Sequence, residues 1–126
     1  MRNITVEVLD VEYTGTTAPA KDQVEMLQIA AQAGLMPVIS PEVGDFAIMT
    51  AVAGTSAGAT ARLAELCLNN GKFKRADGVP VAENLFQDKA HGYLLLIGKV
   101  LRENIGPFWS LNSDAKSPAG ETVTPQ

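Results

Sequence analysis

Apolar and polar residues alternate along the N-terminal segment of the chain. Every second residue from Ile4 to Val8 is apolar, and the alternation continues in the opposite phase from Leu9 to Tyr13. Alternation with a period of two indicates a β-strand that buries one face. The change of phase predicts a bulge or bend near residues 8–10, because one extra residue moves the following side chains to the other face. We expect a glycine turn at residues 13–17 to close this strand.

Three later segments have apolar residues at spacings of three and four, which indicates one buried helical face in each. The first segment begins after Pro19 and ends near Gly34, and a connector with two prolines follows it over residues 35–43. The second segment runs from Asp45, its expected N-cap, to residue 70. The third, residues 82–105, would be about 36 Å long as an unbroken helix.

The third predicted helix is apolar on most of its sides, because Leu94, Leu95 and Leu96 widen its main stripe. Such a helix must lie at the centre of the fold or contact a second chain, which makes a homo-oligomer one alternative. Residues 73–81 alternate around an Ala-Asp-Gly turn and predict a short hairpin or a loop. Together these elements predict an α+β fold that is mainly helical. It has three principal helices, an N-terminal strand and a short hairpin in a single globular domain, residues 1–111.

Composition fits a soluble globular protein with a modest core. The chain has 126 residues, of which 46% are hydrophobic and 19% are charged. Its formal net charge of -4 and its pI near 4.9 argue against general nucleic-acid binding, which requires a basic face. Residues 112–126 have no bulky side chain apart from Val123, so we expect a disordered C-terminal tail.

Several features argue against secretion, membrane insertion and metal binding. The N-terminus has no apolar segment of the signal-peptide type, and the longest uncharged segment, residues 46–61, is shorter than the roughly 20 residues that span a bilayer. The single cysteine, Cys67, excludes an internal disulfide, and we expect its thiol to be buried. The single histidine, His91, lacks the clustered ligands of a metal site. We therefore expect a cytoplasmic protein without metal, cofactor or membrane contact.

Residues 54–58 (GTSAG) have the pattern G-x-S-x-G, which has two interpretations. In the first, Ser56 is a nucleophile on a strand, turn and helix, and Asp77 or a triad through Asp88 and His91 supplies the base. The residues GTSAGA resemble the serine motif of patatin-like acyl hydrolases, in which an aspartate followed by glycine is the second catalytic group. Only 20 residues separate Ser56 from Asp77, which is too few for such a fold. We favour the second interpretation, in which Ser56 is a small contact residue within a continuous helix.

The order of the predicted elements carries a further resemblance. An extended start precedes a helix that contains the stretch Gln23 to Gln32 (QVEMLQIAAQ), and the last helix closes in Arg-Glu-Asn within Tyr93 to Pro118 before a polar tail. In this layout the chain resembles the tail assembly chaperones of long-tailed bacteriophages. The resemblance implies a non-enzymatic protein of the host cytoplasm, absent from the mature virion. Such a protein holds the tape measure protein soluble and recruits tail tube protein. It also implies a longer frameshifted form, although the Gly-Lys codons at the slip site of some relatives have no counterpart near this C-terminus.

A chaperone of this kind would bind a long amphipathic partner by helix-in-groove contact. The apolar side of the third helix and the small residues of the second would supply the contacts. The predicted partner-contacting residues are Ala51, Ala57, Leu94, Leu95, Val100 and Leu101. Two other functions fit the sequence. A small phage structural or head-to-tail joining protein would be present in purified virions, and a serine acyl hydrolase would react through Ser56.

Overall fold

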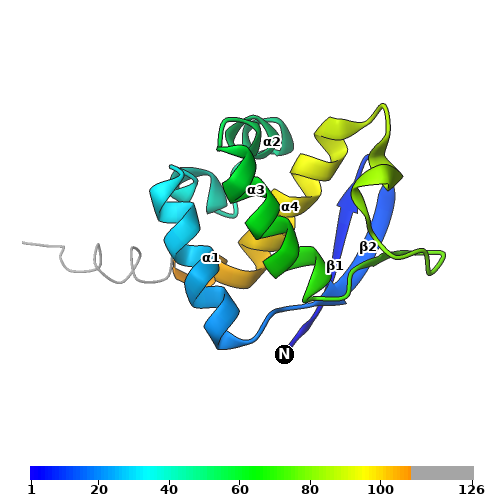
Figure 1. The fold of residues 1–126 in the computed structure, drawn as a ribbon, viewed down its shortest axis with the longest axis horizontal. Coiled ribbons are helices and arrows are strands. Elements are labelled where there is room, and N and C mark those ends of the chain that lie inside the picture. The colour runs from blue at the N-terminus through cyan, green and yellow to red at the C-terminus, as the bar shows by residue number, and fades with distance from the viewer. Residues whose placement is uncertain (109–126) are drawn as a thin grey trace, which may run out of the picture.

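Four α-helices and a three-stranded antiparallel sheet form the part of the chain that the computed structural model describes, residues 1–108 (Figure 1). This architecture confirms the predicted α+β, mainly helical fold class. The predicted tail, residues 112–126, and the domain boundary at residue 111 lie outside the described residues. The strands are β1 (Asn3–Val8), β2 (Val11–Thr16) and β3 (Lys74–Arg75), and the helices are α1 (Ala20–Gln32), α2 (Asp45–Ala53), α3 (Ala57–Ala64) and α4 (Ala90–Ile105).

The N-terminal segment is a β-hairpin and not one bulged strand. β1 and β2 pair antiparallel through a two-residue turn, with Val8 opposite Val11. The turn residues, Leu9 and Asp10, have φ values of 52° and 66°. A two-residue turn explains the change of phase, because it places the apolar side chains of both strands on one face of the sheet. The predicted glycine turn over residues 13–17 is also wrong, since β2 continues to Thr16.

The predicted hairpin at residues 73–81 is confirmed, and its first strand joins the N-terminal sheet. Lys74 pairs with Pro80 across a tight turn, and Arg75 donates its backbone N–H to the carbonyl of Val79 at 2.8 Å. β3 also pairs with β2, which gives the strand order β1-β2-β3. The buried Phe73 ring lies against the backbone of Gly15, where a Cβ atom would be 2.4 Å from the ring. Gly15 therefore provides the space that fixes this hairpin on the sheet.

The second predicted helix, residues 45–70, is interrupted after Ala53. α2 ends there, α3 begins at Ala57, and a π-helix, Glu65–Asn69, follows α3. Hydroxyl groups satisfy backbone groups at the interruption. Thr55 donates its hydroxyl to the Val52 carbonyl at 2.8 Å, and Ser56 Oγ accepts the backbone N–H of Ala59 at 3.1 Å. These bonds replace helical ones, which is why threonine and serine favour helix ends.

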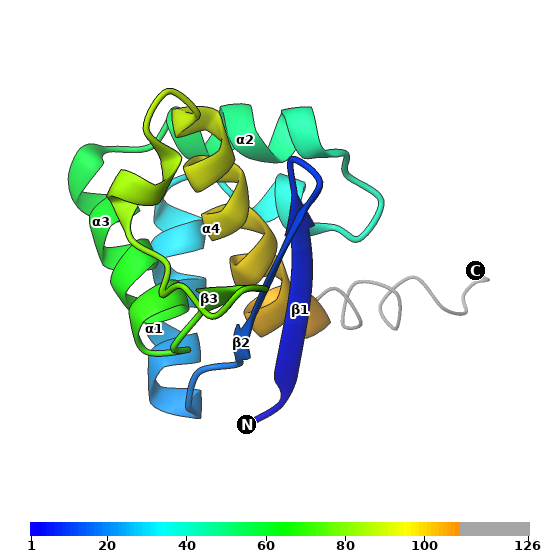
Figure 2. The same ribbon diagram turned by 90° about the vertical axis from the view of Figure 1, so that its right-hand side faces the viewer.

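The third predicted helix is also shorter than expected. Residues 83–86 form a separate 3₁₀-helix, and Asp88 then takes a φ of 66°, which a continuous helix does not allow. α4 therefore begins at Ala90. It lies in the middle of the molecule, with the sheet on one side and α1 on the other, and α2 crosses it at Gly98 (Figures 1 and 2). The apolar surface that suggested a homo-oligomer is thus largely buried within one chain.

Asn104, near the end of α4, is a buried polar residue that joins distant parts of the chain. Its side-chain oxygen accepts the backbone N–H of Ala18 at 2.8 Å and the side-chain amide of Gln23 at 3.2 Å. Its own amide donates to the Val100 carbonyl at 3.0 Å. The start of α1 is therefore fixed to the end of α4 by hydrogen bonds.

The prediction that the Cys67 thiol is buried is confirmed, and burial raises the pKa of this thiol.

Candidate partner-binding grooves

Ser56 does not lie in a catalytic arrangement. It is the N-cap of α3, between two helices, and not at the junction of a strand and a helix. A cavity of about 470 Å³ beside it is lined by Arg62 and residues of α1 and α3, and neither Asp77 nor His91 belongs to that lining. Asp77 instead binds Arg75 at 2.7 Å on the hairpin, and this hydrogen bond lowers the pKa of the carboxyl group. Both expected settings of Ser56 are corrected, because a helix precedes it in place of a strand and the helix around it is interrupted.

Three of the six predicted contact residues lie inside the molecule. Leu95, Val100 and Leu101 have exposed fractions of 5%, 0% and 1%. The reason is the central position of α4, which uses these side chains to pack against the sheet and the other helices. Val100 and Leu101 are corrected to core residues, because a partner cannot reach them without disrupting the fold, whereas Leu95 lines a surface groove beside α2. Ala51 on α2 is half-buried, and Ala57 is exposed.

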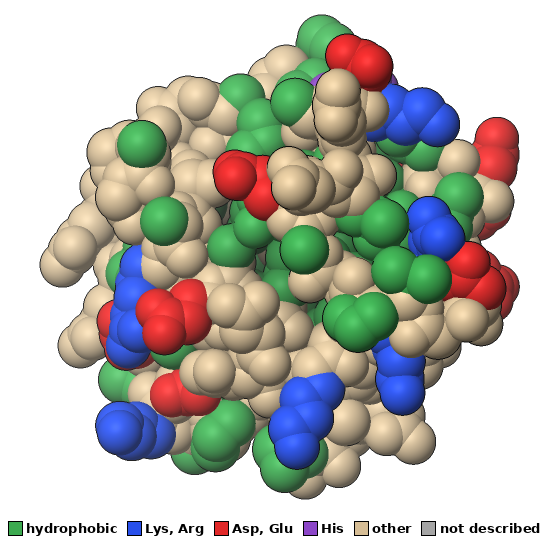
Figure 3. Space-filling view, turned by 45° about the vertical axis from the view of Figure 1, so that its right-hand side comes forward, with side chains coloured by type: hydrophobic (Ala, Val, Ile, Leu, Met, Phe, Trp, Pro, Cys, Tyr) green, Lys and Arg blue, Asp and Glu red, His purple; other side chains and the backbone are tan. Residues whose placement is uncertain are grey.

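The structure brings Ala57 and Leu94 together. Both line a groove with a cavity volume of about 500 Å³ between α3 and α4, which we call the small-residue groove. Figure 3 shows apolar side chains gathered around a hollow on the side of the molecule that it presents. Ala51 is not part of the lining. The residues that line the small-residue groove include Ala53, Ala57, Thr60, Ala61, Tyr93 and Leu94.

Small residues of α3 line one side of the small-residue groove. Ala57, Ala61 and Ala64 recur at spacings of four and three on α3 and form a low floor, which allows another backbone to approach closely. Half-buried Tyr93 and Leu94 supply apolar contact on the other side. Burial raises the pKa of the Tyr93 phenol, and nearby Glu83 raises it further, so the hydroxyl stays protonated at neutral pH and can donate a hydrogen bond.

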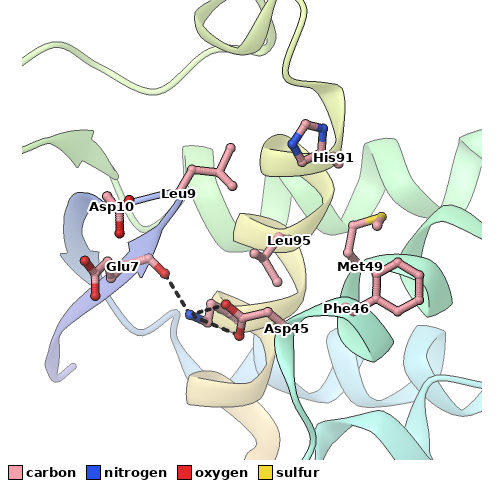
Figure 4. Close-up of a pocket in the computed structure, with 9 residues that line it drawn as sticks. Glu7, Leu9, Asp10, Asp45, Phe46, Met49, His91 and Leu95 are labelled. Atoms are coloured by element: carbon pink, nitrogen blue, oxygen red, sulfur yellow. Dashed lines mark hydrogen bonds and ion pairs between the residues drawn. The ribbon is translucent and has the colours of Figure 1, made fainter.

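A second groove was not predicted from the sequence. It lies between the β1-β2 turn, the start of α2 and α4, and its most exposed apolar side chain is Phe46, with an exposed fraction of 77% (Figure 4). Helix geometry could have found it. Ile48 and Val52 are the buried residues of α2, and Phe46 lies about 200° from Ile48 around the helix axis, which places it on the outer side.

Metal ligands do not cluster in residues 1–108, where no three or more histidine, cysteine, aspartate or glutamate side chains are placed to hold an ion. Within the same residues, none of the helices has the length and apolar character needed to cross a bilayer.

Comparison with protein-family models, with curated proteins and with solved structures found no match to this chain. Functional inference therefore depends on its own residues, their geometry and the resemblance in layout.

Proposed function

We propose that this protein is a non-enzymatic tail assembly chaperone of a long-tailed bacteriophage. It binds the tape measure protein and recruits tail tube protein in the host cytoplasm, and it leaves before the virion is complete. One observation carries the binding role. Ala57 and Leu94, which the sequence singled out as contact residues on two different helices, line one groove on the surface. The resemblance of the chain's layout to this family supplies the identity of the partners.

The small-residue groove would bind an amphipathic helix of the tape measure protein. The alanine floor on α3 lets the partner's backbone approach, and Leu94 packs against its apolar side. Each leucine of the partner that becomes fully buried contributes roughly 1.5–3 kcal/mol. A few such contacts are enough to hold an otherwise aggregating helix in solution. The effect is larger if the tape measure protein contains several such helices, because linked segments bind more tightly than one alone.

Co-expression with the tape measure protein of the same gene cluster tests the proposal. We expect the tape measure protein to be soluble with the wild-type chain, and insoluble with Ala57→Glu or Leu94→Glu. Each variant places a carboxylate in the groove. Ala31→Glu and Val24→Glu are matched controls, because both residues are exposed on α1 and neither lines the groove. Circular dichroism verifies that all four variants fold.

The opposite results are equally clear. If Ala57→Glu and Leu94→Glu keep the tape measure protein in solution, the small-residue groove is not its binding site. Recovery of the protein from purified virions in fixed proportion to other components would instead identify a structural or head-to-tail joining protein. Intact mass analysis of N-terminally tagged products from the native locus adds an independent result, since a second, longer species is expected for a chaperone made in two lengths.

A further inference from the structure

The second groove combines apolar walls with an acidic rim, and we call it the acidic-rim groove. Its cavity volume is about 450 Å³. Leu9 comes from the β1-β2 turn, Phe46 and Met49 come from α2, and Leu95 comes from α4 (Figure 4). Leu9 and Phe46 are 43% and 77% exposed. Two large apolar side chains on facing elements are thus accessible to a partner at the edges of one groove.

Leu9 occupies a position that leucine does not favour. Its φ of 52° lies in the left-handed region, where the two-residue turns of hairpins normally have asparagine or glycine. A branched aliphatic side chain gains no local hydrogen bond there that would offset the strain. The end of its side chain reaches toward α4, where it would lie 2.9 Å from a Cβ atom at Gly92. The turn therefore holds an apolar side chain at the edge of the groove, although the backbone at Leu9 is strained.

The charges around the acidic-rim groove are mostly negative. Glu7, Asp10 and Asp45 line it, and the basic residues beside them are Lys99 and His91. Lys99 is already engaged, because its ammonium donates to the Glu7 carbonyl at 2.7 Å and to Asp45 at 3.3 Å (Figure 4). The Lys99 side chain is only 16% exposed, whereas that of Asp45 is 56% exposed. A molecule that approaches the groove therefore meets carboxylates before it meets the ammonium.

We propose that the acidic-rim groove binds an amphipathic α-helix of a partner protein whose apolar stripe is flanked by lysine or arginine residues. The apolar side chains of the helix pack between Leu9 and Phe46, and its cations face Glu7, Asp10 and Asp45. A second copy of this chain fits poorly, because two-fold pairing of this face would bring its own carboxylates together. The lining shares no residue with the small-residue groove, so this binding site does not depend on the proposed function.

Two synthetic helical peptides of about 18 residues, or five turns, test the charge requirement with the full-length protein. Both peptides have the same leucine stripe, and the flanking positions are lysine in one and glutamate in the other. We expect fluorescence anisotropy to give a dissociation constant at least about tenfold lower for the lysine peptide. The difference should shrink as salt is added, because the rim charges are exposed. Equal affinities of the two peptides would overturn the proposal.

Variants locate the binding site. Phe46→Ala should weaken binding of the lysine peptide by about 10-fold or more, because it removes an aromatic ring that the peptide buries. Asp10→Asn should weaken binding by a few-fold, and asparagine tolerates the positive φ at that position, so the turn is kept. Val24→Ala is the matched control, since Val24 is 57% exposed on α1 and outside the groove.

Three results would contradict the assignment. The first is wild-type affinity of Phe46→Ala, whose melting temperature should be unchanged because the ring is exposed. The second is loss of lysine-peptide binding in Ala57→Glu, which would move the site to the small-residue groove. The third is a concentration-dependent dimer in sedimentation velocity that Phe46→Ala abolishes, which would make a second copy the occupant.

Discussion

Replacement of Gly98 by alanine should destabilise the domain, because α2 and α4 cross closely at this glycine. A Cβ atom there would lie 2.3 Å from Cγ2 of Ile48 and 3.2 Å from Cγ2 of Val52. The shorter distance falls more than about 1 Å below ordinary carbon contact. The Ile48 side chain is branched at Cβ, so its Cγ2 methyl group cannot rotate away easily. α2 itself must therefore move. Overpacking of this kind costs about 1–3 kcal/mol, and the better helix propensity of alanine returns about 1 kcal/mol.

We therefore expect Gly98→Ala to lose about 1 kcal/mol net, with a fall in Tm of roughly 4 °C measured by circular dichroism. Gly58→Ala is the matched control, because a Cβ atom at Gly58 in α3 meets nothing within 4 Å. That variant should be as stable as the wild type or slightly more stable. Adding Ile48→Ala to Gly98→Ala should remove the clash, so the two effects will not be additive. A Gly98→Ala protein that melts at or above the wild-type temperature would refute this account of the helix crossing.

Three further predictions follow from buried and charged groups. Asn104→Ala should lose about 1–3 kcal/mol in urea denaturation, because the buried backbone N–H of Ala18 is left without its acceptor; unchanged stability would mean that water replaces the side chain. The Cys67 thiol, whose pKa is raised by burial, should react with a thiol reagent only after unfolding, and fast labelling of the native protein would contradict its position. Arg62 lowers the pKa of Glu25, so their ion pair stabilises the fold above the ordinary pKa of glutamate, and this contribution is lost as pH falls through the lowered pKa. Glu25→Gln should therefore be less stable than the wild type at neutral pH and equal to it in strong acid, and a difference that persists in acid would rule out the pair as its source.

Hydrophobic periodicity predicted which segments form helices and strands better than it predicted where each one begins and ends. The alternation in β1 and β2 was visible, but Leu9 is not a turn residue, so the sequence suggested a bulge where the chain reverses. The apolar stripe of α2 continues into α3 nearly in phase, which hid the interruption, although Ser56 is a good N-cap. At the start of α4, Asp88 has a φ of 66°, which aspartate tolerates better than most residues, but hydrophobic periodicity does not indicate where such a residue interrupts a helix.

The candidate sites were predictable only in part. Ala57 was predicted as a small residue of the second helix, and Leu94 as part of the apolar surface outside the main stripe of the third; the structure places both at the surface, in one groove. Val100 was assigned to the surface because a helix that is apolar on most sides can be central or can meet another chain, and a single sequence does not distinguish the two. The acidic-rim groove combines residues that are far apart in sequence, such as Glu7 and Asp45, so helix geometry indicates the exposed Phe46 but not the carboxylates beside it.

Among the four α-helices of residues 1–108, the central one is also the last to be synthesised. β1, α1, α2 and α3 all pack on α4, whose residues are made after every element that needs them. At about 5–20 residues per second, a ribosome adds the sixteen residues of α4 within a few seconds, and until then the earlier elements have no common core. We expect nascent chains arrested before residue 90 to be protease-sensitive and chains that expose residue 105 outside the ribosome to be resistant. The order of synthesis thus makes the completion of this domain a single late event.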